Sequence, residues 1–215
     1  MTPGTLVLLH SPLTTASAWG SLPDVLGAYD VVVPEITDDD RPPYASRYVA
    51  RAALEITAAG ARPPVVLVGH SGAGPLLPPI GAAQRAAHRL VGGYVFVDAE
   101  LPPPAGTSRL DQATAFAPDV AEFLRSGGRF PDWEPPAGVT LRPRGEDFFA
   151  EELPMPQDWP DAPCGYLRTS AAYDGQAAQA RLRGWTVAVN DAGHFAAVAD
   201  PLATARALTE LIEAL

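Results

Sequence analysis

Short apolar runs alternate along the chain with longer segments of helical character. The runs lack the polar alternation of half-exposed strands, so they are typical of strands covered on both faces of a parallel sheet. We expect strands at Thr5–His10, Asp30–Pro34, Val65–Gly69, Gly93–Asp98, Gly165–Thr169 and Thr186–Asn190. We expect helices between them at Ala45–Ala59, Gly74–Ala87, Gly175–Arg183 and Pro201–Leu215. The alternation predicts an α/β fold, with a mostly parallel six-stranded sheet flanked by helices.

One segment does not follow this alternation. Residues 99–163 separate the fourth and fifth predicted strands and include a further predicted helix at Ala117–Arg125. Twelve of the 24 prolines fall within residues 102–163. We therefore expect one domain, residues 1–215, in which residues 99–163 form a small Pro-rich cap over one edge of the sheet. Because proline restricts φ and lowers the entropy lost on ordering, this cap is expected to be stiff.

Composition and charge exclude several classes of function. The length of 215 residues fits a single domain, and one cysteine, Cys164, excludes an intramolecular disulfide. All 15 basic residues are arginines, so mechanisms that need a Schiff-base or P-loop lysine are excluded. The net charge of −10 argues against nucleic acid or an anionic membrane as partner. With no signal-peptide pattern or membrane-length apolar stretch in the sequence, we expect a cytoplasmic monomer or homodimer that acts on a small molecule.

A strand that runs into a Gly-x-Ser-x-small turn is the first candidate for chemistry. Residues 65–74 read VVLVGHSGAG, and a predicted helix follows. The serine of such a turn sits in a tight, strained bend, so the residues two before and two after it must be small. The bend lifts the hydroxyl above the carboxyl edge of the sheet, where open α/β folds bind ligands. Ser71 is the predicted nucleophile; the alternative is an ordinary capping serine.

A base for this serine must come from a loop at the same edge of the sheet. His194 meets that condition, because it follows the last predicted strand in the segment NDAGH. The acid that would orient it has two candidates at the ends of neighbouring strands. Asp98 ends the fourth strand, and Asp174 follows the fifth, where it would also make a good helix N-cap. The sequence leaves both open.

Four segments together resemble the α/β-hydrolase fold family, and its small esterases and hydroxynitrile lyases in particular. These segments read LLHSPLTTASAW, VLVGHSGAG, VFVDAELPPP and DAGHFAAVADP, and they span the chain. The resemblance implies a serine nucleophile at Ser71, a histidine base at His194 and no cofactor. It also implies that the amide of Gly72 forms one half of the oxyanion hole.

The second half of the oxyanion hole departs from the family pattern. The residue expected to donate an amide is Pro12, which has no N–H. Leu13 is the predicted donor after a shift of one residue, and the hydroxyl of Ser11 or Thr14 is the alternative. A half-formed hole would favour a reaction with less charge on the substrate oxygen.

The predicted function is cleavage of an ester, thioester or lactone by a cofactor-independent serine hydrolase. The alternatives are a lyase or cyclase that uses the Ser–His pair for proton transfer, and a ligand-binding protein on the same scaffold. No His–carboxylate cluster has metal spacing, and no GxGxxG follows a strand, so we expect no metal and no dinucleotide. The residues expected to line the substrate pocket are His10, Pro12, Trp19, Trp133 and Trp159.

Overall fold

A computed structural model describes residues 3–37 and 40–215. Within this part of the chain, six parallel strands form one sheet in the order β2-β1-β3-β4-β5-β6. The strands are β1 (Thr5–Leu9), β2 (Val31–Val32), β3 (Val65–His70), β4 (Val91–Val97), β5 (Cys164–Arg168) and β6 (Thr186–Val189). The predicted α/β fold with a parallel six-stranded sheet is confirmed.

The central strands are apolar throughout because both faces of the sheet are covered. Every residue of β1, β3 and β4 is buried, whereas the edge strand β6 is only half-buried. The second strand is shorter than predicted, and only Val31 and Val32 pair with β1. Pro34 lies just beyond it and has no N–H to continue the ladder.

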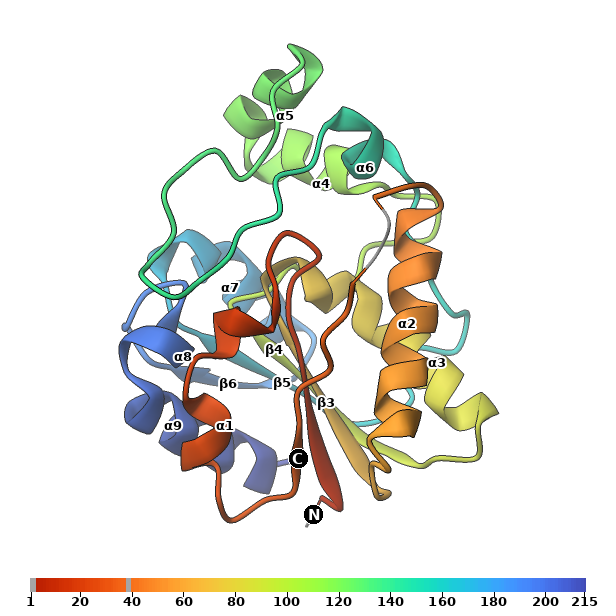
Figure 1. Cartoon of the computed structure of the whole chain (residues 1–215), viewed down its shortest axis with the longest axis vertical. Coiled ribbons are helices and arrows are strands. Elements are labelled where there is room, and N and C mark those ends of the chain that lie inside the picture. Colours follow the sequence, from red (N-terminus) through yellow and green to blue (C-terminus); the bar gives the residue numbers. More distant parts are fainter. Residues whose placement is uncertain (1–2, 38–39) are drawn as a thin grey trace.

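Helices cover the two faces of the sheet, which makes three layers (Figure 1). On one face α2 (Tyr44–Ala58), α3 (Leu77–Ala86) and α7 (Asp174–Leu182) pack on one set of strand side chains. On the other face α1 (Leu22–Val25) and α9 (Pro201–Glu213) pack on the alternate set. The described helices include none long and apolar enough to cross a membrane. Shorter elements are η1 (Ala16–Trp19), η2 (Ser71–Leu76), η3 (Ala171–Tyr173) and α8 (Ala196–Ala199).

Prolines change the helix that was predicted at Gly74–Ala87. The chain first forms the 3-10 helix η2 and becomes α-helical only at Leu77. Pro75 lies inside η2, and Pro78 sits in the first turn of α3, where a missing N–H costs no hydrogen bond. The chain therefore turns sharply after β3, through a 3-10 helix, before α3 begins.

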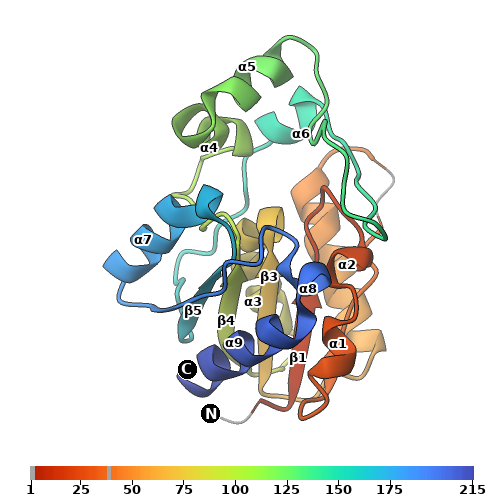
Figure 2. The ribbon, with the colours of Figure 1, turned by 90° about the vertical axis from the view of Figure 1, so that its left-hand side faces the viewer.

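The segment between β4 and β5 lies beyond the carboxyl ends of the strands, far from both termini (Figures 1 and 2). It contains α4 (Arg109–Phe116), α5 (Pro118–Arg125) and α6 (Glu146–Ala150). Only α5 was predicted, whereas α4 begins at a capping box between Ser108 and Asp111. The segment has its own apolar cluster, whose buried members are Leu13, Tyr44, Leu124, Phe148 and Phe149. Leu13 and Tyr44 join it to the rest of the domain.

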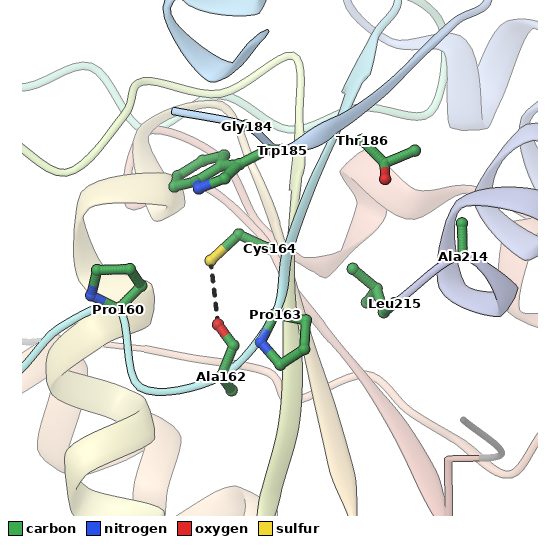
Figure 3. Close-up of a pocket in the computed structure, with 9 residues that line it drawn as sticks. All are labelled: Pro160, Ala162, Pro163, Cys164, Gly184, Trp185, Thr186, Ala214 and Leu215. Carbon is green, nitrogen blue, oxygen red and sulfur yellow. Dashed lines mark hydrogen bonds between the residues drawn. The ribbon is translucent and has the colours of Figure 1, made fainter. Parts of the chain in front are cut away.

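A cavity of about 300 Å³ lies at the amino ends of β5 and β6, at the other end of the strands from Ser71 (Figure 3). It is lined by Cys164 and Thr186, the first residues of β5 and β6, and by Leu215. The Cys164 thiol donates a hydrogen bond to Ala162 O at 3.5 Å, and burial raises the pKa of Cys164 to about 12. The cysteine is therefore a protonated core residue, far from the carboxyl edge where ligands are expected.

Candidate active site

Ser71 lies in the sharp turn between β3 and η2. Its φ of 55° is in the left-handed region, a conformation that costs a non-glycine residue about 1–3 kcal/mol and clusters at active sites. Small neighbours make the turn possible, since a Cβ at Gly69 would lie only 2.9 Å from Leu77 Cδ2. The strand–turn–helix geometry expected around Ser71 is present.

His194 joins Ser71 to an acidic residue through both of its ring nitrogens. Its Nε2 lies 3.1 Å from Ser71 Oγ, and its Nδ1 lies 2.9 Å from Asp98 Oδ2. The loop that carries it follows β6 and is tied to the end of β5, because the Gly193 amide donates to Thr169 O at 2.8 Å. Three residues that are far apart in the sequence thus form one hydrogen-bonded chain.

Asp98 is fully buried and accepts hydrogen bonds on both oxygens. Oδ1 accepts from the amides of Thr169 at 2.7 Å and Ser170 at 3.0 Å. Oδ2 accepts from the Ser170 hydroxyl at 2.5 Å and from His194. Burial opposes ionisation, but the hydrogen bonds from His194, Ser170 and Thr169 outweigh it and hold the pKa of Asp98 below its ordinary value. Asp98 is therefore an ionised carboxylate in a fixed orientation.

Asp174, the other candidate acid, has a different partner. Its Oδ1 lies 2.9 Å from Arg168 Nε, and its side chain is 63% exposed at the start of α7. Arg168 also pairs with Asp191. Of the two candidates left open by the sequence, the structure brings Asp98 and not Asp174 to His194.

Two aromatic rings hold His194 in place. His70 Nε2 donates to His194 O at 2.8 Å, and the two rings lie 4.6 Å apart. Burial, followed by the charge of His194, lowers the pKa of His70 to about 3, so this ring is neutral. On the other side, the Tyr173 ring stacks parallel to His194 at 5.1 Å.

Neither ring was assigned a role from the sequence. Strand alternation carries a signal that was missed. Within β3, His70 shares the face of Val66 and Val68, which is the face covered by α9. A residue at the carboxyl end of that face lies beneath the loop that leads into α8 and α9, and so beneath His194.

The loop after β1 presents a hydroxyl group to the turn at Ser71. Leu13 N donates to Ser11 Oγ at 3.1 Å, and Thr14 Oγ1 donates to Ser11 O at 3.2 Å. The predicted Leu13 amide is thus already engaged, and so is the Thr14 hydroxyl. Ser11 Oγ lies only 2.9 Å from the point where a Cβ on Gly72 would stand. The hydroxyl beside the Gly72 backbone is therefore that of Ser11.

A pocket of about 700 Å³ opens above Ser71 and His194. The β4–β5 segment forms much of its wall, and its lining is mainly apolar. Trp133 lines the pocket as predicted, and its ring lies edge-on to Phe195 at 5.8 Å. Other apolar lining residues are Leu101, Pro102, Phe116, Val120, Phe130 and Phe149.

The remaining residues predicted to line the pocket lie elsewhere. His10 is buried behind the loop after β1, where Nδ1 donates to Ser11 O at 2.8 Å and Nε2 accepts from Ile36 N at 3.2 Å. Trp19 is in the core beneath His70, at 5.8 Å from its ring. These predictions failed because large aromatic and imidazole side chains serve equally well in a core.

Pro12 and Trp159 are also outside the pocket lining. Pro12 lies behind Gly72, with its Cδ 3.7 Å from the point where a Cβ on that glycine would stand. Trp159 belongs to the β4–β5 segment but packs into the core, against Phe96 at 6.3 Å and Trp185 at 5.8 Å.

The described residues contain no group of three or more His, Cys, Asp or Glu that could hold a metal ion.

Comparisons with known proteins agree with this fold. The sequence model of the alpha/beta hydrolase family matches residues 6–207. The chain belongs to the alpha/beta hydrolase family. This membership confirms the expected family and the expectation that the chain is a hydrolase enzyme. A comparison with curated proteins found no match.

Solved structures share the fold of this hydrolase at low sequence identity. An extracellular alpha/beta-hydrolase from a Paenibacillus species, described as homologous to tobacco salicylic acid binding protein 2, superposes with a TM-score of 0.69 at 16% identity, over 97% of this chain and 99% of that one. A pyrethroid hydrolase from Sphingobium faniae JZ-2 gives 0.67 at 19%, over 98% and 97%. A variant of tomato methylketone synthase I, in complex with β-ketoheptanoate, gives 0.69 at 11%, over 100% and 99%.

Proposed function

We propose that this hydrolase cleaves an ester, thioester or lactone through Ser71, His194 and Asp98. The observation that carries the proposal is the hydrogen-bonded chain Ser71–His194–Asp98, with distances of 3.1 and 2.9 Å. Nucleophile, base and acid in that order form the arrangement that activates a serine hydroxyl.

The reaction proceeds in two halves. Ser71 Oγ attacks the carbonyl carbon while His194 Nε2 takes the hydroxyl proton, and Asp98 stabilises the imidazolium through Nδ1. The tetrahedral intermediate collapses as His194 returns the proton to the leaving oxygen or sulfur, which leaves an acyl group on Ser71. A water molecule, deprotonated by His194, then attacks this acyl group, and the acid is released as Ser71 recovers its proton.

The oxyanion is stabilised by the amide of Gly72 and the hydroxyl of Ser11. Pro12 has no N–H, and the Leu13 amide already donates to Ser11 Oγ. A hydroxyl that accepts this bond is free to donate its own proton, and it lies close to Gly72. The hydrogen bond from Leu13 also fixes the oxygen of Ser11, so the donor is oriented before the substrate arrives.

The segment of residues 99–163 acts as a cap that closes the pocket over the serine. Its apolar lining excludes water and favours an apolar acyl or alcohol group. In support of hydrolysis, one protein of the same fold is named a pyrethroid hydrolase.

The second candidate is a reaction that uses Ser71 and His194 for proton transfer alone. Tomato methylketone synthase I, whose name does not describe a hydrolase, shares the fold. The missing amide at Pro12 favours this candidate, while the hydroxyl of Ser11 near Gly72 favours hydrolysis.

A panel of 4-nitrophenyl esters with short acyl chains tests the proposal. We expect turnover that Ser71→Ala and His194→Ala each reduce by at least about 10³-fold. Ser126→Ala, at an exposed serine of the cap, is the matched control and should keep full activity. Turnover that is unchanged in Ser71→Ala would reject Ser71 as the nucleophile, and no turnover by the unaltered protein would reject hydrolysis in favour of the second candidate.

A further inference from the structure

Four charged residues line the mainly apolar pocket, and two of them, Arg109 and Glu100, lie beside the turn at Ser71. Arg109 is the first residue of α4, and Glu100 follows the end of β4. The hydrogen-bonded chain Ser71–His194–Asp98 uses neither of them. Charged groups are rarely buried without a partner, so their presence in the pocket wall indicates a role in binding.

Arg109 is almost completely buried and only partly satisfied. It is 3% exposed, and its Nη1 has no hydrogen-bond partner among the described residues. Its Nη2 lies 3.5 Å from Gly72 O, at the limit of a hydrogen bond, and its guanidinium lies 4.8 Å from the centre of the Phe148 ring. The cation is therefore positioned against the backbone next to the nucleophile and retains an unused donor.

The position of Arg109 is unfavourable for the folded chain by itself. It stands at the N-terminal end of α4, where the helix dipole disfavours a cation. The nearby carboxylate of Glu151 is occupied by two amides of α2, those of Tyr44 and Ala45, both at 2.6 Å. A buried cation in such an unfavourable position is typical of a functional site.

Glu100 does not hydrogen-bond to this cation. Its Oε2 is buried and also lacks a hydrogen-bond partner in the described part of the chain. Burial raises the pKa of Glu100 above its ordinary value, although the charges of Arg109 and His194 oppose the shift. No hydrogen bond joins Glu100 and Arg109 in the described part of the chain, so the guanidinium keeps its unused donor at Nη1.

We infer that Arg109 binds a carboxylate on the substrate. This inference rests on the proposed function and narrows its substrate class to esters or thioesters that carry a free carboxylate, such as monoesters of dicarboxylic acids. The planar guanidinium matches a carboxylate, and the bond is strengthened because the Arg109 side chain is buried. Since Arg109 touches the backbone of Gly72, the carboxylate lies close to the carbonyl that Ser71 attacks.

Two 4-nitrophenyl esters of adipic acid test the inference. One is the half-ester with a free carboxylate, and the other carries a methyl ester in its place. We expect kcat/KM to be about tenfold to a hundredfold higher for the half-ester, as befits a hydrogen bond to a charged group. Arg109→Gln should abolish this preference. Turnover by Ser71→Ala is subtracted throughout, because the half-ester also hydrolyses by attack of its own carboxylate.

Arg183→Gln is the matched comparison. Arg183 also lines the pocket, but it is exposed and stacks over Trp185 at 5.4 Å. The half-ester preference should survive this substitution. Equal kcat/KM for the two esters in the unaltered protein, or a preference lost in Arg183→Gln and kept in Arg109→Gln, would overturn the inference.

A second measurement needs no variant, in case Arg109→Gln does not fold. Monomethyl adipate should inhibit turnover of 4-nitrophenyl butyrate at a concentration at least about tenfold lower than dimethyl adipate does. Equal inhibition by the two compounds contradicts the inference. Neither of these results touches the proposed function, which fails if 4-nitrophenyl butyrate is not turned over or if its turnover does not depend on Ser71.

Discussion

Replacement of Asp98 by Asn tests the orientation of His194. The Asp98 carboxylate accepts four hydrogen bonds, from Thr169 N at 2.7 Å, Ser170 N at 3.0 Å, Ser170 Oγ at 2.5 Å and His194 Nδ1 at 2.9 Å. Asparagine keeps the shape, and its oxygen satisfies the two amides. Its NH₂ group then faces His194 Nδ1, which must become an acceptor.

A histidine that accepts at Nδ1 carries its proton on Nε2, so it cannot take the proton of Ser71. The corresponding substitution in a serine protease lowers kcat by about 10⁴, and we expect a loss of about 10³–10⁴ in Asp98→Asn. The loss of charge-assisted hydrogen bonds should also lower the free energy of unfolding by about 2–3 kcal/mol.

The matched control is Asp174→Asn, which removes an exposed ion pair with Arg168. Such a pair contributes about 0–1 kcal/mol to stability. Because Asp174 pairs with Arg168 and not with His194, activity should fall less than about fivefold. The assay is kcat/KM with 4-nitrophenyl butyrate, with thermal unfolding as the check on folding. A larger loss of activity in Asp174→Asn than in Asp98→Asn would refute the assignment of Asp98.

Three further predictions concern residues near Ser71, His194 and Asp98 and in the cap. Ser11→Ala should lower kcat by about 10²–10³ with little change in KM, whereas Thr14→Val should retain most activity; equal effects on kcat would argue against Ser11 as an oxyanion donor. The pKa of His70 in the folded state, about 3, lies below its ordinary value. Its contribution to stability is therefore complete above about pH 6.5 and is lost as the pH falls towards 3, by up to about 1.4 kcal/mol per pH unit. Urea unfolding between pH 4 and 7 should show this slope reduced in His70→Asn, and an unchanged slope would mean that His70 is not buried as a neutral ring. Phe148→Ala should lower the stability measured by thermal unfolding by about 3–5 kcal/mol, because Phe148 is buried where the cap joins the domain, and an unchanged Tm would contradict that packing.

The sheet and the turn at Ser71 were predictable because their signals are local. A strand covered on both faces is apolar throughout, and the turn after Val65–His70 needs small residues at fixed positions. His194 followed from topology, since the carboxyl ends of parallel strands meet at one edge of the sheet.

The choice between Asp98 and Asp174 was not predictable, because it depends on how the ends of β4 and β5 stand relative to the last loop. The amides of Thr169 and Ser170 close around Asp98, while Arg168 draws Asp174 outward. Neither effect has a sequence pattern.

The cap and its pocket were predictable only in outline. Proline density marked the segment, but α4 is too short and too polar to show a periodic signal, and its capping box at Ser108 was overlooked. Trp19 and Trp159 were expected in the pocket and lie in the core, because an aromatic residue fills either environment. Arg109 gave no signal, since an arginine in a sequence is normally exposed.

The central claim is that Ser71 carries the acyl group during the reaction. The direct measurement is mass spectrometry of the protein quenched during turnover of 4-nitrophenyl butyrate, with the modified peptide identified after digestion. The account predicts a butyryl group on Ser71, which accumulates further when His194→Ala is treated with a reactive ester and fails to deacylate. Turnover without any acyl group on Ser71, or an acyl group on another residue, would contradict it.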